Sequence, residues 1–234
     1  MDMTPCSNGP SGPTDWNAID WCKANRMVRN LRRRIYRATA EGDLRKVRSL
    51  QKLMLRSYAN KVVGVRKVAQ QNTGASTPGV DHVLAKTPAT RGQLVDALRT
   101  VRKIKANPVR RIYIPKASGK QRPLGIPTML DRAAQAVVKN SMEPEWEAKF
   151  EPTSYGFRPG RSAQDAMQKI YQNTRSGCRK QWVVDADIKG CFDNIDHDKL
   201  LEALDTFPAK REVQAWLKAG YMEDGVRQPT DTGT

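Results

Sequence analysis

Residues 182–196 have the sequence WVVDADIKGCFDNID, and this stretch decides how the rest of the chain is interpreted. Alternate side chains of a strand share a face, so Asp185 and Asp187 would lie on the same side of a mostly apolar, buried strand over 182–188. A carboxylate at the end of a buried strand needs a partner that offsets its desolvation, and a divalent metal ion is a common catalytic one. Alone, the pair is weak evidence. Helix caps or surface ion pairs are the structural alternatives, especially for the acidic residues that follow, Asp193, Asp196 and Asp198.

The chain is strongly basic, with 41 Lys and Arg against 24 Asp and Glu among 234 residues and a formal net charge of +17. Residues 23–67 hold 15 of the basic residues and two acidic ones, so they carry +13 of that charge. A segment of one sign repels itself unless a polyanion neutralises it, which predicts salt-sensitive binding of nucleic acid. A solvated helical surface is the alternative. A membrane-surface helix is disfavoured because the segment lacks a face rich in Trp, Phe and Leu.

Composition also bounds the compartment. No apolar run approaches the roughly 20 residues that cross a bilayer, and the first residues do not form a secretory signal. The four cysteines show no CxxC spacing, and two histidines disfavour a His/Cys zinc site. We therefore expect no membrane association and free thiols in a reducing, cytoplasmic compartment.

Hydrophobic spacing and turn residues predict an α+β fold. Residues 1–15, rich in Pro, Gly and Ser, are expected to be disordered. Residues 111–126 predict a β-hairpin with a basic tip, and helices are expected on both sides of it along the chain. Helices are expected over 17–40, 44–65 (as a single helix), 90–105, 197–204 and 212–219. Another is expected to be capped by Asp131 and to run towards 143–144, and a further one to follow the capping residues Ser162 and Asp165.

Four segments, in order along the chain, carry a resemblance. They are TPGVD at 77–81, RIYIPK at 111–116 with QRPLGIP at 121–127, SYGFRPGRS at 154–162, and DIKGCFDNIDH at 187–197. Together they resemble the N-terminal extension loop, the fingers hairpin, the second block and motif A of the reverse transcriptases that group II introns encode. The resemblance implies part of a polymerase right-hand fold with an antiparallel palm sheet. Its parts would be a tail at 1–15, a basic helical extension at 16–90, fingers at 91–180 and the start of a palm at 181–234.

The resemblance also implies roles for single residues. Asp187 would be catalytic and would ligate Mg²⁺, one of two such ions, together with the carbonyl of Ile188. Phe192 would lie beneath the sugar of the nucleotide, with core packing as its alternative, and His197 would only begin a helix. The triphosphate would be bound by Lys116 and Arg122. Template, primer or intron RNA would be bound by Arg32, Arg33, Arg34, Thr77, Pro78, Gly79, Arg158 and Arg161, where a structural ion pair is an almost equal alternative for Arg158 and Arg161.

The implied activity is RNA-directed DNA polymerisation, with assistance to intron RNA splicing and mobility. Its partners would be an RNA template or intron RNA, a DNA primer and dNTP, and a homodimer is left open. No Asp-Asp dipeptide occurs in the sequence, and residues 231–234 fall inside the family's next block, so we expect an N-terminal piece that is inactive alone. The alternatives are a non-catalytic, RNA-binding splicing factor of the maturase type, or a reverse transcriptase of a retron or CRISPR system.

Overall fold

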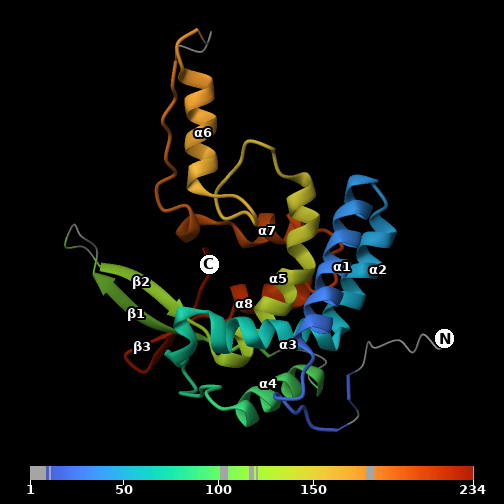
Figure 1. Ribbon diagram of the computed structural model, residues 1–234. Coiled ribbons are helices and arrows are strands. Elements are labelled where there is room, and N and C mark those ends of the chain that lie inside the picture. Colours follow the sequence, from blue (N-terminus) through green and yellow to red (C-terminus); the bar gives the residue numbers. More distant parts are fainter. Residues whose placement is uncertain are drawn as a thin grey trace, which may run out of the picture.

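The computed structural model describes residues 9–10, 12–100, 105–115, 119, 121–177 and 182–233. Figure 1 shows a helical body from which a β-hairpin and helix α6 project. The helices are α1 (Trp21–Ala40), α2 (Leu44–Arg56), α3 (Tyr58–Arg66), α4 (Pro88–Thr100), α5 (Met129–Lys149), α6 (Ala163–Thr174), α7 (His197–Ala203) and α8 (Lys210–Leu217). The strands are β1 (Val109–Pro115), β2 (Gln121–Ile126), β3 (Tyr221–Glu223) and β4 (Val226–Gln228).

Helix α1 begins at Trp21, four residues later than the sequence predicts, ends at Ala40 as predicted, and lies against α5 (Figure 1). The side chain of Asp20 caps its first turn by accepting a hydrogen bond from the backbone N–H of Lys23 (2.9 Å). Its apolar residues recur at three- and four-residue steps and are buried, which commits one face to the core and leaves the other to the basic residues. The buried face consists of Ala24, Val28, Leu31, Ile35 and Ala38.

The single helix predicted over 44–65 is wrong, because Ser57 divides it into α2 and α3. Ser57 is extended (φ −61°, ψ 125°), and its hydroxyl accepts the hydrogen bond that caps α3. Breaking a helix inside the core leaves carbonyl groups that need donors. The fully buried Asn60 supplies one, since its side-chain amide donates to the carbonyl oxygen of Met54 (3.0 Å), and the same amide donates to the carbonyl oxygen of Val137 in α5 (3.0 Å).

Helix α5 begins one turn earlier than the sequence suggests. The predicted cap, Asp131, is wrong: Thr128 is the N-cap, and its hydroxyl accepts from the N–H of Asp131 (3.1 Å). The Asp131 carboxylate instead accepts hydrogen bonds from the Thr128 hydroxyl (2.7 Å) and from the indole N–H of Trp216 in α8 (3.1 Å). The helix also passes through Pro144 and ends at Lys149. Asp131 therefore joins α5 to α8, which its helix-cap pattern alone does not reveal.

The sheet confirms the α+β class and adds two strands that the sequence analysis did not predict. Its order is β2-β1-β3-β4. The predicted hairpin is antiparallel, with Ile112 opposite Leu124, and β3 pairs antiparallel with β4. Strand β1 pairs in parallel with β3, with Val109 opposite Tyr221. The sheet thus joins the hairpin to the segment after α8.

The buried strand predicted over 182–188 is not present. This segment has no regular secondary structure, and its apolar side chains are largely in solvent, with Trp182 92% and Val184 90% exposed. A strand is stabilised by pairing, and the four-stranded sheet of the described residues does not include this segment. The apolar pattern predicted a buried strand, but burial requires a neighbouring strand or helix that the described residues do not place there.

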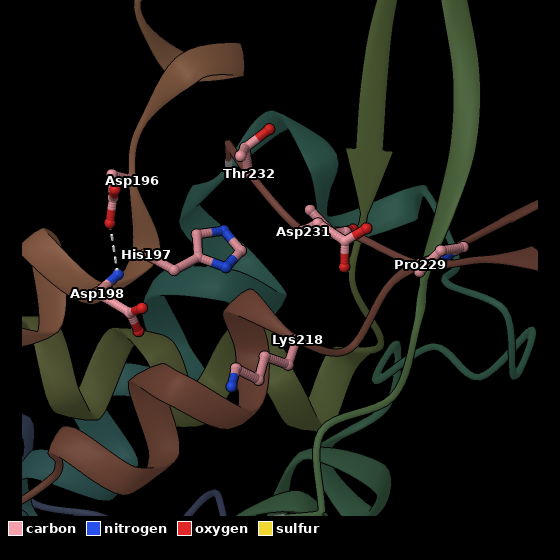
Figure 2. Close-up of a pocket in the computed structure, with 8 residues that line it drawn as sticks. Asp196, His197, Asp198, Lys218, Pro229, Asp231 and Thr232 are labelled. Carbon is pink, nitrogen blue, oxygen red and sulfur yellow. Dashed lines mark hydrogen bonds between the residues drawn. The ribbon is translucent and has the colours of Figure 1, made fainter.

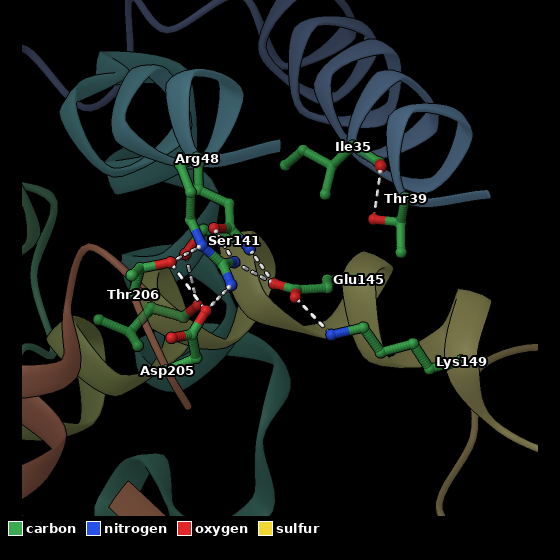
Figure 3. A network of polar contacts seen from close by, with 10 residues as sticks. Ile35, Thr39, Arg48, Ser141, Glu145, Lys149, Asp205 and Thr206 are labelled. Atoms are coloured by element: carbon green, nitrogen blue, oxygen red, sulfur yellow. Dashed lines mark hydrogen bonds and ion pairs between the residues drawn. The ribbon is translucent and has the colours of Figure 1, made fainter. Parts of the chain in front are cut away.

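A polar network ties α2 to α5 and to the turn after α7 (Figure 3). The Arg48 guanidinium donates to the carboxylate of Glu145 (2.6 Å) and to the hydroxyl of Thr206 (2.9 Å), and it lies 3.6 Å from the carboxylate of Asp205. Glu145 is almost fully buried. One arginine thus connects the N-terminal helices with residues more than 150 positions later.

The described part of the expected disordered tail lies against α4. Thr14 is buried, and its hydroxyl and backbone N–H donate to the carboxylate of Asp96 (2.7 and 2.9 Å). The Thr14 carbonyl approaches Gly92 so closely that a Cβ there would lie 2.3 Å away. Residues near Thr14 are therefore packed, whereas the sequence predicted disorder up to residue 15. Within the described ranges, no helix combines the length and the apolar composition that crossing a membrane requires.

Candidate nucleic-acid interface

Two of the three arginines predicted to bind RNA on α1 are available. Arg33 and Arg34 are exposed, and neither makes an ion pair or hydrogen bond with another described residue. Arg32 is partly buried, and its guanidinium pairs with the carboxylate of Glu143 in α5 at 2.5 Å. Arg32 therefore helps to attach α1 to α5, and its charge is already partly neutralised.

The wider basic segment is also mostly unneutralised. Lys46 and Arg48 join Arg32 in ion pairs, and Arg66 lies over the ring of Trp21 at 4.3 Å. Other basic side chains of the segment are exposed and form no ion pair within the described residues. They are Lys23, Arg26, Arg29, Arg33, Arg34, Arg37, Arg45, Lys52, Arg56 and Lys67. This concentration of unpaired cations is the electrostatic footprint of a surface that binds a polyanion.

A hollow of about 500 Å³ lies between α1 and α5. Tyr36 lines it and is 47% exposed. The sequence analysis singled out neither Tyr36 nor Arg37, although Arg33, Tyr36 and Arg37 have the spacing of neighbours on one helix face. The lining residues are Arg32, Arg33, Tyr36, Arg37, Ala40, Pro144 and Glu147.

The loop Thr77–Gly79 is fastened to the start of α5. The guanidinium of Arg132 donates to the carbonyl oxygens of Thr77 (2.6 Å), Gly74 (2.8 Å) and Pro127 (2.8 Å). Gly79 is buried against Thr128, where a Cβ would lie 2.7 Å from the Thr128 Cα. Thr77 and Pro78 are partly exposed, so they remain proposed contacts for nucleic acid, while Gly79 serves the packing that holds them.

The fingers hairpin presents one of its two predicted phosphate ligands. Arg122 in β2 is exposed opposite Ile114 and has no hydrogen bond or ion pair among the described residues. Lys116 lies outside the described residues. The base of the hairpin is anchored to β3, because the Arg111 guanidinium stacks 3.8 Å from the centre of the Tyr221 ring.

Arg158 is held inside the protein. Its guanidinium is buried and donates to both carboxylate oxygens of Glu147 (2.7 and 3.0 Å) and to the carbonyl oxygens of Glu151 and Ser154. The hydrogen bond to Glu147 raises the pKa of Arg158 and lowers that of Glu147. The structural ion pair is therefore present, and the guanidinium is not free to bind a nucleic-acid backbone. Arg161 remains partly exposed and donates to the carbonyl of Pro152.

Asp187, Ile188 and Phe192 are all exposed. The carboxylate of Asp187 accepts a hydrogen bond from the N–H of Ile188 (2.9 Å). Phe192 is 59% exposed and begins a short 3₁₀ turn, so core packing is not its role within the described residues. The turn is covered by Gly233, whose added Cβ would lie 2.9 Å from the Phe192 carbonyl oxygen.

Asp187 alone does not make a magnesium site. Mg²⁺ takes oxygen ligands in a near-octahedral arrangement, and Asp187 supplies one carboxylate. Within the described residues, no group of three or more His, Cys, Asp or Glu side chains could hold a metal ion. The residues present therefore do not by themselves fit the two-ion site that the resemblance implies.

A second hollow, of about 410 Å³, lies beside the start of α7 (Figure 2). His197 begins α7 as predicted and is buried; its Nε2 lies 2.6 Å from the carbonyl oxygen of Gly233. Asp196 caps the helix by accepting from the N–H groups of Asp198 (2.9 Å) and Lys199 (3.0 Å). These groups organise the turn after Phe192, which matches the structural alternatives for the acidic residues here.

Two protein-family matches follow one another along the chain. Residues 16–98 match the N-terminal domain of reverse transcriptase, which includes the basic helices. Residues 114–233 match the reverse transcriptase (RNA-dependent DNA polymerase) family, which includes Arg122, Asp187 and Phe192. The second match covers about half of the chain.

Similar proteins occur in bacteria and in Euglena gracilis. The chain is 35% identical to Protein YkfC of Escherichia coli over 179 residues, which is 71% of this chain and 46% of that protein. It is 42% identical to the group II intron-encoded protein LtrA of Lactococcus lactis over 132 residues, 54% of this chain and 22% of LtrA. It is 26% identical to Maturase-like protein 1 of Euglena gracilis over 188 residues, 79% of this chain and 41% of that protein.

The chain thus spans less than half the length of these curated relatives. Both family matches follow one another along the sequence as the extension and the polymerase portion do, and the relatives include a group II intron-encoded protein and a maturase-like protein. The chain therefore belongs to the reverse transcriptase/maturase family of the group II intron-encoded proteins.

Proposed function

We propose that the chain supplies the RNA-binding extension and the nucleotide-facing fingers of an RNA-directed DNA polymerase encoded by a group II intron. The observation that carries this proposal is the reverse transcriptase match over 114–233, because it spans Asp187, to which the resemblance to motif A gives the role of the catalytic carboxylate. Arg122 is exposed and unpaired in the described part of the hairpin, which suits binding of a nucleotide triphosphate. DNA primer, dNTP and Mg²⁺ belong to this proposal.

Assistance to splicing and mobility of the intron RNA is part of the same proposal. It is supported by the unpaired cations of residues 23–67, which can neutralise RNA phosphates without an intact polymerase site. A location in the bacterial cytosol or an organelle matrix agrees with bacterial and intron-encoded relatives such as LtrA, and we keep it as a proposal.

A second candidate function is RNA binding without polymerisation, as in a maturase-type splicing factor. Two observations on the described residues favour it. Most cations of the basic segment have no ion pair there, and no group of three metal-ligating side chains is present. The basic segment would then be the whole functional surface, and Asp187 would be dispensable.

The two candidates are separated by replacing Asp187 in a polymerase-competent version of the protein that carries an Asp-Asp hairpin. Asp187→Ala should abolish primer extension on an RNA template and leave the affinity for RNA unchanged, because phosphate contacts on α1 do not use this carboxylate. Asp198→Ala, which removes an exposed carboxylate in the first turn of α7, is the matched control and should retain extension. Unchanged extension by Asp187→Ala would contradict the polymerase assignment.

A further inference from the structure

We propose that the hollow between α1 and α5 binds one unpaired nucleobase of an RNA strand, with the base stacked on Tyr36 and the adjacent phosphates at Arg33 and Arg37. The inference rests on the proposed RNA-binding function and specifies it. It names the feature of the RNA that this face recognises, a base outside a duplex.

The arrangement of α1 brings the required groups to one place. Tyr36 and Arg37 lie three and four residues after Arg33, and Ala40 lies four and three residues after them, so the four share a face, and all of them line the hollow. Tyr36 is 47% exposed, although it sits beside the apolar surface of Ala40 and Pro144. A half-exposed aromatic ring at the wall of an apolar hollow is a stacking surface that lacks a stacking partner among the described residues.

The charges around the hollow select an anionic ligand. Its two neighbouring carboxylates are already neutralised inside the protein, Glu143 by Arg32 at 2.5 Å and Glu147 by Arg158 at 2.7 Å. Arg33 and Arg37 are exposed and have no ion pair or hydrogen bond with other described residues. The hollow therefore carries two unbalanced positive charges beside the Tyr36 ring.

Arg158 takes on a different role in this arrangement. Nucleic-acid contact and a structural ion pair were almost equal alternatives for Arg158, and its guanidinium donates to both carboxylate oxygens of Glu147. Without that pair, the Glu147 carboxylate would face the hollow and repel phosphate. The residues predicted separately on α1 and on the 154–162 segment thus meet at one site, where Arg158 keeps the hollow positive.

The size of the hollow and the chemistry of its lining favour an unpaired nucleobase over a base that is paired in a duplex. Hollows of about 300–1,000 Å³ hold single small ligands, and this one has about 500 Å³. In a duplex the faces of the bases are stacked inside, whereas unpaired bases can be splayed out and stacked on aromatic or arginine side chains. An acidic peptide would use the two arginines but would gain little from the ring, so its binding would not depend on Tyr36.

The test compares three variants of the full chain with the unmodified protein, using a short single-stranded RNA that contains one fluorescent adenine analogue and the same RNA paired with its complement. Tyr36→Ala should weaken binding of the single strand about tenfold, because base–aromatic stacking contributes about 1–3 kcal/mol. Tyr36→Phe should keep the affinity, since it keeps the ring. Tyr171→Ala is the matched control, because it removes a more exposed tyrosine on α6, and it should change nothing.

Two further measurements separate stacking from charge. Quenching of the adenine analogue should be lost in Tyr36→Ala and kept in Tyr36→Phe, while duplex binding stays the same in both. Arg33→Ala should lower the log–log salt slope for the single strand by about 0.7, and Tyr36→Ala should leave the slope unchanged. Thermal unfolding of each variant checks that the substitution leaves the protein folded.

Failure of the base site differs from failure of the RNA-binding function. If the unmodified chain binds RNA and Tyr36→Ala binds both RNAs as tightly, or loses both equally, the base site is wrong and RNA binding stands. If an acidic peptide displaces the RNA and binds Tyr36→Ala equally well, the hollow is a protein-docking site and the inference is overturned. Absence of RNA binding by the unmodified chain would instead overturn the proposed function.

Discussion

Glu145 is a carboxylate that the protein keeps ionised while burying it. Only 3% of the residue is exposed, and its oxygens accept hydrogen bonds from Arg48 (2.6 Å), Gln51 (2.7 Å) and Lys149 (2.7 Å). Burial acts to raise the pKa of Glu145, but the hydrogen bonds from Arg48, Lys149 and Gln51 together outweigh it and lower the pKa. The charge is therefore stable only while its donors are present.

Removing one donor tests this dependence. Arg48→Ala should lower the free energy of unfolding by about 3 kcal/mol or more, because it leaves a buried carboxylate without its main cation. Lys149→Ala removes a cation that is 42% exposed from the same carboxylate, and it should cost less than about 1 kcal/mol. Urea unfolding of both variants supplies the comparison. If both variants lost the same free energy of unfolding, the buried ion pair of Arg48 with Glu145 would contribute no more than the exposed one of Lys149.

Acid should weaken the same network. The folded-state pKa of Glu145 lies below its ordinary value, so the stability it contributes is present above about pH 4.3 and is lost as the pH falls through the folded-state pKa. Glu145→Gln cannot titrate, and its free energy of unfolding should fall less steeply over that acidic range than that of the unmodified chain. Other carboxylates titrate in both proteins, so the difference between the two curves isolates Glu145. Parallel curves would contradict the assignment.

At the scale of elements, the loop Thr77–Gly79 and helix α5 act as one unit. Gly79→Ala should destabilise the protein by about 1–3 kcal/mol, because the new methyl group would meet the backbone of Pro127 and Thr128 at 2.7–2.9 Å, and that backbone cannot move without displacing the start of α5. Gly74→Ala lies in the same region with its nearest neighbour 3.9 Å away, and it should stay within about 0.5 kcal/mol. Thermal unfolding measures both. A similar shift for the two variants would show that the loop is not tightly packed on α5.

Elements with local signals could be predicted from the sequence. The apolar steps of α1, the capping box of α6 and the two runs of the hairpin are each decided by residues within a few positions of one another. The break at Ser57 could not be predicted, because it is stabilised by the distant contact of Asn60 with the carbonyl of Val137. The segment 182–188 has the pattern of a strand but lacks a neighbour among the described residues, and pairing is a property of the fold rather than of the segment.

The candidate site shows the same limit. Sequence motifs singled out Arg122 and Asp187, and both are exposed, although Asp187 was predicted to lie at the end of a buried strand. Motifs could not distinguish an arginine that binds RNA from one that pairs inside the protein, since Arg33 and Arg158 both stand in basic, motif-like surroundings. The difference is made by Glu147, whose carboxylate lies on another element and takes up Arg158.

At the scale of the whole molecule, helix α5 pairs with some arginines of the chain and leaves other basic residues unpaired. Its three glutamates each hold an arginine from another element: Glu143 holds Arg32, Glu145 holds Arg48 and Glu147 holds Arg158. These pairs attach α1, α2 and the 151–162 segment to one central helix. Most other basic residues of the 23–67 segment are exposed and form no ion pair within the described residues, so they remain available to a polyanion.

We expect the 234-residue chain to bind RNA without polymerising DNA. Its affinity for RNA should fall steeply with salt, with a log–log slope near −0.7 to −0.9 for each phosphate neutralised, and Arg33→Ala combined with Arg34→Ala should make the slope shallower. Primer extension should be absent, because Asp187 is one carboxylate, the sequence has no Asp-Asp dipeptide, and the described residues gather no group of three metal ligands. Binding is measured by fluorescence anisotropy across a salt series, and extension on a primed RNA template. Salt-independent binding would contradict the electrostatic interface. Extension that Asp187→Ala abolishes would show that this chain already contains a complete active site.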